Sequence, residues 1–342
     1  MTVIMTHLWL LALAALAAAL VTGALRRYAL AHRVLDTPNA RSSHAAPTPR
    51  GGGLAIVLSY SACLIWLTTV GAVPYAWSIS LLGAGAIVAC VGFIDDHGHV
   101  AARWRLIAHF CAAAWVLSWL GTLPQFELLG SIAALTPIAP GLAALYLVWM
   151  LNLYNFMDGI DGIASVEAIC VCLGGAALYL LADRPVLALL PLSLAAATAG
   201  FLYWNLPPAR IFMGDSGSGF IGIALGTMSL HAGQVAPPLF WSWLILLGVF
   251  VVDATFTLLR RLLRGERIYE AHRSHAYQYA ARRFGRHLPV TLAVGMLNLC
   301  WLMPIALCVG VGELDGTVGL GIAYFPLVLL VLQFRAGAKE GR

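Results

Sequence analysis

Residues 76–96 read AWSISLLGAGAIVACVGFIDD, an apolar stretch that ends on two adjacent carboxylates. Its apolar part, 76–94, has close to the roughly 20 residues that cross a bilayer as an α-helix. Adjacent carboxylates repel each other, so a cation, a nearby arginine or a raised pKa must compensate their charge. Because acids beside membrane segments are costly to keep, the stretch predicts a membrane-spanning helix that ends at a functional site.

The whole chain shares this apolar character. Of its 342 residues 61% are hydrophobic and 10% are charged, and its mean hydropathy is +0.86. Soluble domains have about 25% charged residues, so the composition excludes that class. The seven cysteines lie inside apolar runs without CxxC or Cys/His spacing, which favours buried thiols. We predict a single all-α polytopic membrane domain, 1–342, that is embedded in the lipid bilayer and has no nucleic-acid partner.

The apolar runs predict eleven membrane-spanning helices, at 4–25, 53–71, 76–94, 105–122, 138–155, 163–182, 186–204, 217–234, 239–259, 289–311 and 317–334. The loops on one side are then about 26–52, 95–104, 156–162, 205–216 and 260–288, followed by the tail. Nineteen of the 20 Lys and Arg residues lie in these segments or at their edges, and the exception is Arg184. The positive-inside rule therefore predicts a periplasmic N-terminus and a cytoplasmic C-terminus.

Three acidic motifs fall on the predicted cytoplasmic side, although basic residues alone set that orientation. Asp95 and Asp96 end the third span, Asp158 and Asp161 follow the fifth, and Asp215 follows the seventh. Mg²⁺ is usually held by one or two carboxylates together with substrate phosphates. The motifs therefore predict a cation-dependent site for an anionic substrate on the cytoplasmic face.

Polar and glycine residues accompany the acids. In the stretch 152–162, Asn155, Asp158 and Gly162 would share one face of a helical turn, and a tight turn with Asp161 as a helix cap is the alternative. The three glycines at 51–53 open a helix, where backbone N–H groups approach a phosphate closely, or they form a plain junction.

The loop 260–288 is the most basic. Its arginines suit phosphate binding, and attraction to anionic lipid headgroups is the alternative. Arg273 and His275 are its best candidates for the active site. For Asp253, near the end of the ninth span, we expect a structural pairing with an inward arginine.

Taken together, these motifs resemble those of the polyprenyl-phosphate N-acetylhexosamine-1-phosphate transferases, or glycosyltransferase family 4. The matching runs are 49–53, 95–96, 152–162, Asn205 and Phe-Met-Gly-Asp at 212–215. They occur in order over nearly the whole chain, and family members have ten or eleven spans. The resemblance implies that the site uses Mg²⁺, with Mn²⁺ as an alternative.

The resemblance also implies roles for individual residues. The metal ligands are Asp215, the principal one, and Asp96. The catalytic residues are Asp95, Asp96, Asp158 and His275, and the first of the acid pair is proposed to deprotonate the lipid phosphate. The substrate-binding residues are Arg50, Asn155, Asp161, Asn205, Phe212 and Arg273, with Asp161, Asn205 and Phe212 on the nucleotide side.

Two departures from the family pattern bear on the substrate. The pentapeptide-transferase branch of peptidoglycan synthesis has a lysine shortly after its acid pair and a run of histidines in its last large loop. Here His97 and His99 follow the pair, and Tyr277 and Gln278 stand after the single aligned His275. These differences favour the branch that starts O-antigen and enterobacterial-common-antigen lipids.

The implied reaction joins a UDP-N-acetylhexosamine, carrying GlcNAc or a deoxy relative such as FucNAc or QuiNAc, to undecaprenyl phosphate. Its products are undecaprenyl-diphospho-sugar and UMP, made at the bacterial inner membrane, and the chain is compatible with a homodimer. Direct attack by the lipid phosphate and a phosphoryl-aspartate route both fit, and the direct one needs fewer parts. The pentapeptide transferase and an ion-coupled transporter are the alternative functions.

Overall fold

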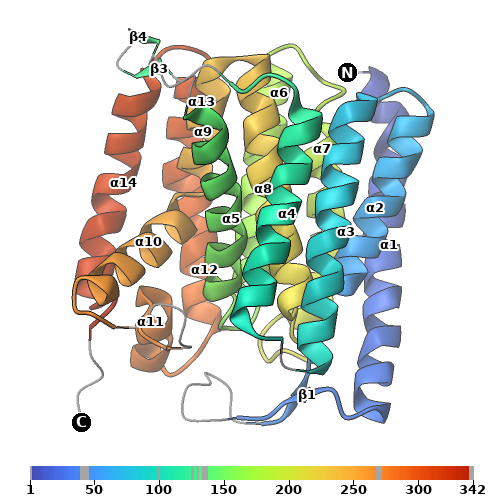
Figure 1. Ribbon diagram of the computed structural model, residues 1–342, viewed down its shortest axis with the longest axis vertical. Coiled ribbons are helices and arrows are strands. Elements are labelled where there is room, and N and C mark those ends of the chain that lie inside the picture. The colour runs from blue at the N-terminus through green and yellow to red at the C-terminus, as the bar shows by residue number, and fades with distance from the viewer. Residues whose placement is uncertain are drawn as a thin grey trace.

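The computed structural model describes residues 2–38, 46–98, 100–124, 127–128, 131–132, 138–266 and 272–338. Parts of the predicted loops 26–52 and 260–288, at 39–45 and 267–271, lie outside the described residues. The described chain is a bundle of helices that run mostly side by side, with the start of α1 and the end of α14 at opposite ends (Figure 1). The helices are α1 (Thr2–Ala31), α2 (Leu54–Thr69), α3 (Tyr75–His97), α4 (Ala102–Leu120), α5 (Ala139–Met157), α6 (Ile163–Leu181), α7 (Leu189–Asn205), α8 (Asp215–Val235), α9 (Pro237–Leu246), α10 (Gly248–Leu262), α11 (Ala276–Phe284), α12 (Leu288–Leu297), α13 (Met303–Gly310) and α14 (Gly316–Gln333).

Two short hairpins accompany the helices. Strand β1 (Leu35–Asp36) pairs antiparallel with β2 (Thr48–Pro49), and β3 (Glu127–Leu128) pairs with β4 (Ser131–Ile132). The all-α prediction missed both, because pairs of two residues leave no periodicity in the sequence. The first hairpin leads directly into the glycines that open α2.

Every one of the eleven predicted segments overlaps a helix. By length and composition, five helices of the described chain are apolar enough to cross a membrane, or six if one bent pair counts as a single span. The chain is therefore an integral membrane protein with several spans, while the number eleven and the orientation stay predictions. The central helix α8 shows why fewer helices pass this hydropathy criterion than the eleven predicted segments. Its serines, glycines and His231 lower its mean hydropathy, but they are buried inside the bundle.

The predicted ninth span, 239–259, is not one straight helix. It consists of α9 and α10, which meet at Leu247 with a bend of 70°. Figure 1 shows α10 crossing obliquely beside the lower half of α14. The break coincides with close packing, because a Cβ on Gly248 would lie 2.9 Å from the Tyr324 ring and 3.2 Å from Leu327. The apolar run alone carried no signal for this bend.

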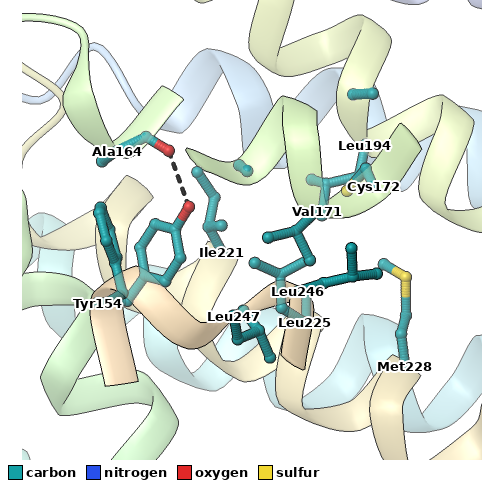
Figure 2. Packing of buried hydrophobic residues seen from close by; sticks show 14 of the residues in the cluster. Tyr154, Ala164, Val171, Cys172, Leu194, Ile221, Leu225, Met228, Leu246 and Leu247 are labelled. Atoms are coloured by element: carbon teal, nitrogen blue, oxygen red, sulfur yellow. Dashed lines mark hydrogen bonds between the residues drawn. The ribbon is translucent and has the colours of Figure 1, made fainter. Parts of the chain in front are cut away.

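Helix α8 forms the centre of the core. It packs against α3, α5 and α9, and its residues from Ser216 to Gly233 are buried. Figure 2 shows Ile221, Leu225 and Met228 of α8 among apolar side chains of neighbouring segments. In the same layer Tyr154 donates a hydrogen bond of 2.8 Å to the Ala164 carbonyl, which ties α5 to α6. This packing fixes the N-terminus of α8, where the third acidic motif begins.

Candidate active site

The first and third acidic motifs meet where α3 ends and α8 begins. The Asp96 carboxylate accepts hydrogen bonds from the backbone N–H groups of Asp215 (3.1 Å) and Ser216 (3.3 Å), and from the Ser216 hydroxyl (3.0 Å). Gly92 permits this contact, because a Cβ there would lie 2.4 Å from the Ser216 nitrogen. An anion at a helix N-terminus is stabilised by unpaired N–H groups and by the helix dipole. Asp96 thus caps α8 from another helix, and its side chain is only 2% exposed.

Arg105, in the first turn of α4, bridges the two other carboxylates of these motifs. Its Nη1 lies 2.9 Å from Asp95 Oδ2 and 3.0 Å from Asp215 Oδ2. A guanidinium carries several N–H donors in a fixed plane, which suits such bridging. Arg105 was not predicted as a site residue, because a basic residue at the edge of a predicted span already has a topological explanation. Its only distinguishing signal was its position shortly after the acid pair.

Arg50 holds the end of α3 from the other side. Its Nε donates to the Asp96 carbonyl (2.8 Å) and its Nη2 to the Asp95 carbonyl (2.9 Å). These carbonyls end a helix and have no intrahelical partner, so a cation is favourable there. The first hairpin supports the arrangement, because Phe212 N–H donates to the Pro49 carbonyl at 2.8 Å. Arg50 therefore holds the end of α3 mainly through the backbone, with its Nε also 4.0 Å from Asp96 Oδ1, and its predicted role in substrate binding stays a prediction.

The second acidic motif joins the same cluster through Asn155. Its Nδ2 donates to Asp215 Oδ1 at 2.9 Å and lies 3.0 Å from the Ser218 hydroxyl. Helix α5 ends two residues later at Met157, so Asp158 lies in the turn that leads to α6. Among the predicted residues, Asn155, Asp95, Asp96 and Asp215 are therefore brought into direct contact or joined through Arg105.

Negative charge accumulates at this end of the bundle. Burial and the nearby charges of Asp215, Asp96 and Asp161 hold the pKa of Asp158 well above its usual range. Burial, a hydrogen bond with Asp95 and the charge of Asp96 raise the pKa of Asp215 to about 6. Such mutual repulsion is what a bound cation relieves.

A second cluster adjoins the first. Asn205 Oδ1 accepts from Gly162 N–H (3.0 Å), and its Nδ2 donates to the Ile211 carbonyl (3.0 Å). Asp161 Oδ2 accepts from Ala209 N–H at 3.0 Å, and its Oδ1 lies 3.3 Å from His287 Nδ1. The loops 156–162 and 205–216 are therefore joined by the two residues predicted to face the nucleotide. Phe212 lies in the same loop, half-buried.

His275 lies in a third group, built around Asp253. The Asp253 carboxylate accepts from the N–H groups of Ala276 and Tyr277, each at 3.0 Å, and lies 3.3 Å from His275 Nδ1. The partner of Asp253 is thus the N-terminus of α11 and a histidine, and the expected inward arginine is wrong. The Tyr277 hydroxyl donates to the Phe156 carbonyl at 2.9 Å, which links this group to the acidic turn.

Arg273 precedes α11, and its carbonyl accepts from Arg282 Nη1 at 3.0 Å. The helix α11 was predicted as part of a loop, because no apolar run of spanning length marks it and the acceptor for its first N–H groups is Asp253 of α10. Neither Tyr277 nor His287 was singled out from the sequence as a contact to the acidic turn.

The residues present fit a metal held partly by substrate. Within the described parts of the chain, no three Asp, Glu, His or Cys side chains gather into a metal cluster. Asp215 is about one-third exposed at 32% and lines a cavity with Asn155, so it offers one accessible carboxylate. Mg²⁺ is commonly bound by one carboxylate together with substrate phosphate oxygens, whereas a metal ion held by protein side chains alone needs several ligands from the chain. The oxygens of Asp96 are already taken by α8, and its predicted ligand role stays a prediction.

Comparison with known proteins gives consistent results. The model of the family described as glycosyl transferase family 4 matches residues 78–233. A probable undecaprenyl-phosphate N-acetylglucosaminyl 1-phosphate transferase of Bacillus subtilis (strain 168) is 30% identical over 264 residues, covering 75% of this chain and 72% of the relative. A decaprenyl-phosphate N-acetylglucosaminephosphotransferase of Mycolicibacterium smegmatis is 30% identical over 281 residues, covering 73% and 69%. A phospho-N-acetylmuramoyl-pentapeptide-transferase of Synechococcus elongatus is 30% identical over 241 residues, covering 66% and 63%.

Proposed function

This chain belongs to glycosyl transferase family 4, an integral-membrane family that transfers sugar phosphates to polyprenyl phosphates, and from that premise we propose its particular reaction. It transfers an N-acetylhexosamine 1-phosphate from a UDP-sugar to undecaprenyl phosphate, giving undecaprenyl-diphospho-sugar and UMP. The sugar is GlcNAc or a deoxy relative such as FucNAc or QuiNAc. Because the chain belongs to this family of transferases, we do not propose the alternative of an ion-coupled transporter.

One observation carries the proposal. Asp215 begins α8 beside the guanidinium of Arg105, lines a cavity, and keeps an accessible carboxylate. Phosphoryl transfer requires mainly positioning and neutralisation of charge rather than covalent chemistry by the protein. A carboxylate that accepts a cation next to an arginine supplies both signs of charge that a diphosphate and a phosphate monoester need.

In the proposed reaction an oxygen of the lipid phosphate attacks the β-phosphorus of the UDP-sugar. A new P–O bond forms, the bond from that phosphorus to the bridging oxygen breaks, and UMP leaves with the electron pair. The second pKa of a phosphate monoester is about 6, so the attacking group is mostly dianionic at neutral pH and needs no strong base. Asp95 accepts hydrogen bonds from Arg105 and from Val100 N–H at 2.7 Å. In this reaction its role is electrostatic, and it does not remove a proton from the lipid phosphate.

The chain's own residues hold these groups in place. Arg50 and Asp96 fix the end of α3 against α8, so Asp215 and Arg105 keep their separation. Mg²⁺, or Mn²⁺ in its place, would be held by Asp215 together with substrate phosphates, and it would supply charge neutralisation. Asp161, Asn205 and Phe212 lie on the joined loops and form the nucleotide side of the site.

We assign the chain to the branch that initiates O-antigen and lipopolysaccharide glycans at the bacterial inner membrane, with the site on the cytoplasmic face. The two relatives named for N-acetylglucosamine 1-phosphate transfer support a donor without a pentapeptide, and the departures from the pentapeptide-transferase pattern after the acid pair and around His275 support this branch. The Synechococcus relative keeps the pentapeptide transferase as a second candidate.

A donor comparison tests the proposal. The purified protein is mixed with undecaprenyl phosphate, Mg²⁺ and either UDP-GlcNAc, UDP-FucNAc or UDP-MurNAc-pentapeptide, and UMP release is followed. Release with one of the first two donors is expected. Release with the pentapeptide donor alone would overturn the branch, and no release with any donor would overturn the proposed reaction. Omitting Mg²⁺ is expected to abolish release.

A further inference from the structure

A cavity extends from the candidate site into the bundle between α3, α4, α5 and α8. Its empty volume is about 390 Å³, part of it open to solvent. Arg105, Asn155 and Asp215 line one part, and Val88, Val91 and Leu151 line another. Two further polar residues, His109 and Asn152, also line it, and the proposed reaction has not yet used either.

His109 and Asn152 lie one turn deeper than the rest of the polar lining. His109 follows Arg105 by four residues on α4, and Asn152 precedes Asn155 by three on α5. Since α4 runs away from the site and α5 runs toward it, both steps lead in the same direction, by about 4.5–6 Å. The cavity therefore has an outer polar level at Arg105 and Asp215 and an inner level, the His109–Asn152 pair.

The hydrogen bonds of the pair fix its donor groups. Asn152 Nδ2 donates to the Val148 carbonyl at 2.7 Å, which sets the orientation of the amide because a carbonyl only accepts. The same Nδ2 lies 3.3 Å from His109 Nδ1, so Nδ1 is the acceptor and the ring proton is on Nε2. Among the described residues nothing accepts a hydrogen bond from His109 Nε2. The pair thus presents to the cavity an N–H donor that has no acceptor within the described chain.

We propose that the His109–Asn152 pair binds a phosphate oxygen of the polyprenyl phosphate acceptor, an inference that rests on the proposed function. A nucleotide sugar is water-soluble and enters from the end that carries the loops, where Asp161 and Asn205 lie. The acceptor phosphate is attached to a chain that stays in the bilayer, so its head reaches the site from the apolar side. An N–H donor on the inner level, next to Arg105, meets that phosphate and not the uridine.

A purely structural histidine would show a different arrangement. In a core, both ring nitrogens are expected to find protein partners, because an unpaired buried polar group is costly. His109 is half-buried, lines a cavity and uses only Nδ1 within the described chain. Asn152 completes the design, since its donation to Nδ1 keeps the Nε2 proton available.

Binding of undecaprenyl phosphate in detergent without any nucleotide tests the inference. His109→Leu is expected to weaken this binding about tenfold or more, since a hydrogen bond to a charged group is lost. His109→Gln, which keeps an N–H donor, is expected to recover part of it. Undecaprenol, which has no phosphate, is expected to bind the wild type and His109→Leu equally. Ser118→Ala, an exposed change on the same helix, is the control.

Equal affinity of the wild type and His109→Leu for undecaprenyl phosphate would overturn the inference, as would an equal loss for undecaprenol. Should gel filtration show that His109→Leu does not fold, Asn152→Leu gives the same test, because it removes the donation to Nδ1 that keeps the Nε2 proton available. With turnover, the KM for undecaprenyl phosphate is expected to rise while the KM for the UDP-sugar stays unchanged, and the reverse pattern would also overturn it. If the wild type shows no turnover, the proposed function fails, while the binding measurement still decides this inference.

Discussion

Replacing Arg105 by alanine perturbs the charge balance of the site most directly. The side chain makes two charge-assisted hydrogen bonds, at 2.9 Å to Asp95 and at 3.0 Å to Asp215. Each such bond contributes about 1.5–3 kcal/mol, and the lower end applies because the guanidinium is 33% exposed and partly screened. The sum is about 3 kcal/mol. If this energy holds the two carboxylates in their reactive positions, its loss corresponds to about a 100-fold fall in kcat.

UMP release at saturating donor and acceptor measures this effect. Arg105→Lys keeps the charge but not the fork of N–H groups, so an intermediate loss of about tenfold is expected. Arg103→Ala is the matched control, because Arg103 is exposed in the same turn of α4 and stacks on Trp104 at 5.6 Å. A kcat for Arg105→Ala within about threefold of the wild type, in a protein with an unchanged Tm, would refute the reasoning.

Three other predictions concern neighbouring features. Asp253→Ala is expected to lower the free energy of unfolding by about 3 kcal/mol in denaturant titrations, because several buried donors lose their acceptor. Thr257→Val removes only one of these donors, so it is expected to lower that free energy by about 1 kcal/mol. Gly214→Ala is expected to reduce turnover at least about tenfold, because φ is +76° and the new Cβ would lie 2.6 Å from the Asp96 carboxylate that caps α8. Gly265→Ala is the control: its φ is +70° but open space surrounds it, so the change strains the backbone by about 1 kcal/mol and the protein is expected to keep its activity. Adding Mg²⁺ near pH 6 is expected to release protons, because the pKa of Asp215 is raised to about 6 and a bound cation favours the ionised carboxylate. Calorimetry in two buffers measures this proton release. If the release persisted in Asp215→Asn, Asp215 would not be the metal ligand.

The positions of the helices could be predicted from the sequence because apolar length is set by the bilayer. Segments such as 76–94 and 163–182 gave helices with nearly the expected bounds. The bend at Leu247 could not be predicted, since it depends on how Gly248 packs against α14, and nothing in the run 239–259 records that contact. The short helix α11 was missed for a related reason, because its N-terminus is capped by Asp253 of a different helix.

The site was predictable where chemistry requires unusual residues and unpredictable where it uses common ones. Asp215 and Asn155 stood out because polar residues are rare in this chain, and the structure places them 2.9 Å apart. Arg105 and His109 did not stand out. A basic residue at a span edge and a lone histidine in an apolar run each have an ordinary explanation, and only the cavity they share distinguishes them.

The acid pair itself shows how far neighbouring residues of one type can diverge. Successive residues of a helix point about 100° apart, so Asp95 and Asp96 meet different surroundings. Asp96 is turned into the bundle, where its carboxylate is 2% exposed and serves the backbone of α8. Asp95 is turned toward Arg105 and is 13% exposed. A loss of activity on replacing Asp96 would therefore reflect a displaced α8 and a displaced Asp215, whereas the same loss on replacing Asp95 would reflect the charge next to the substrate phosphates. The two acids at the end of α3 thus have different places in the structure, because Asp96 holds the N-terminus of α8 and Asp95 faces Arg105.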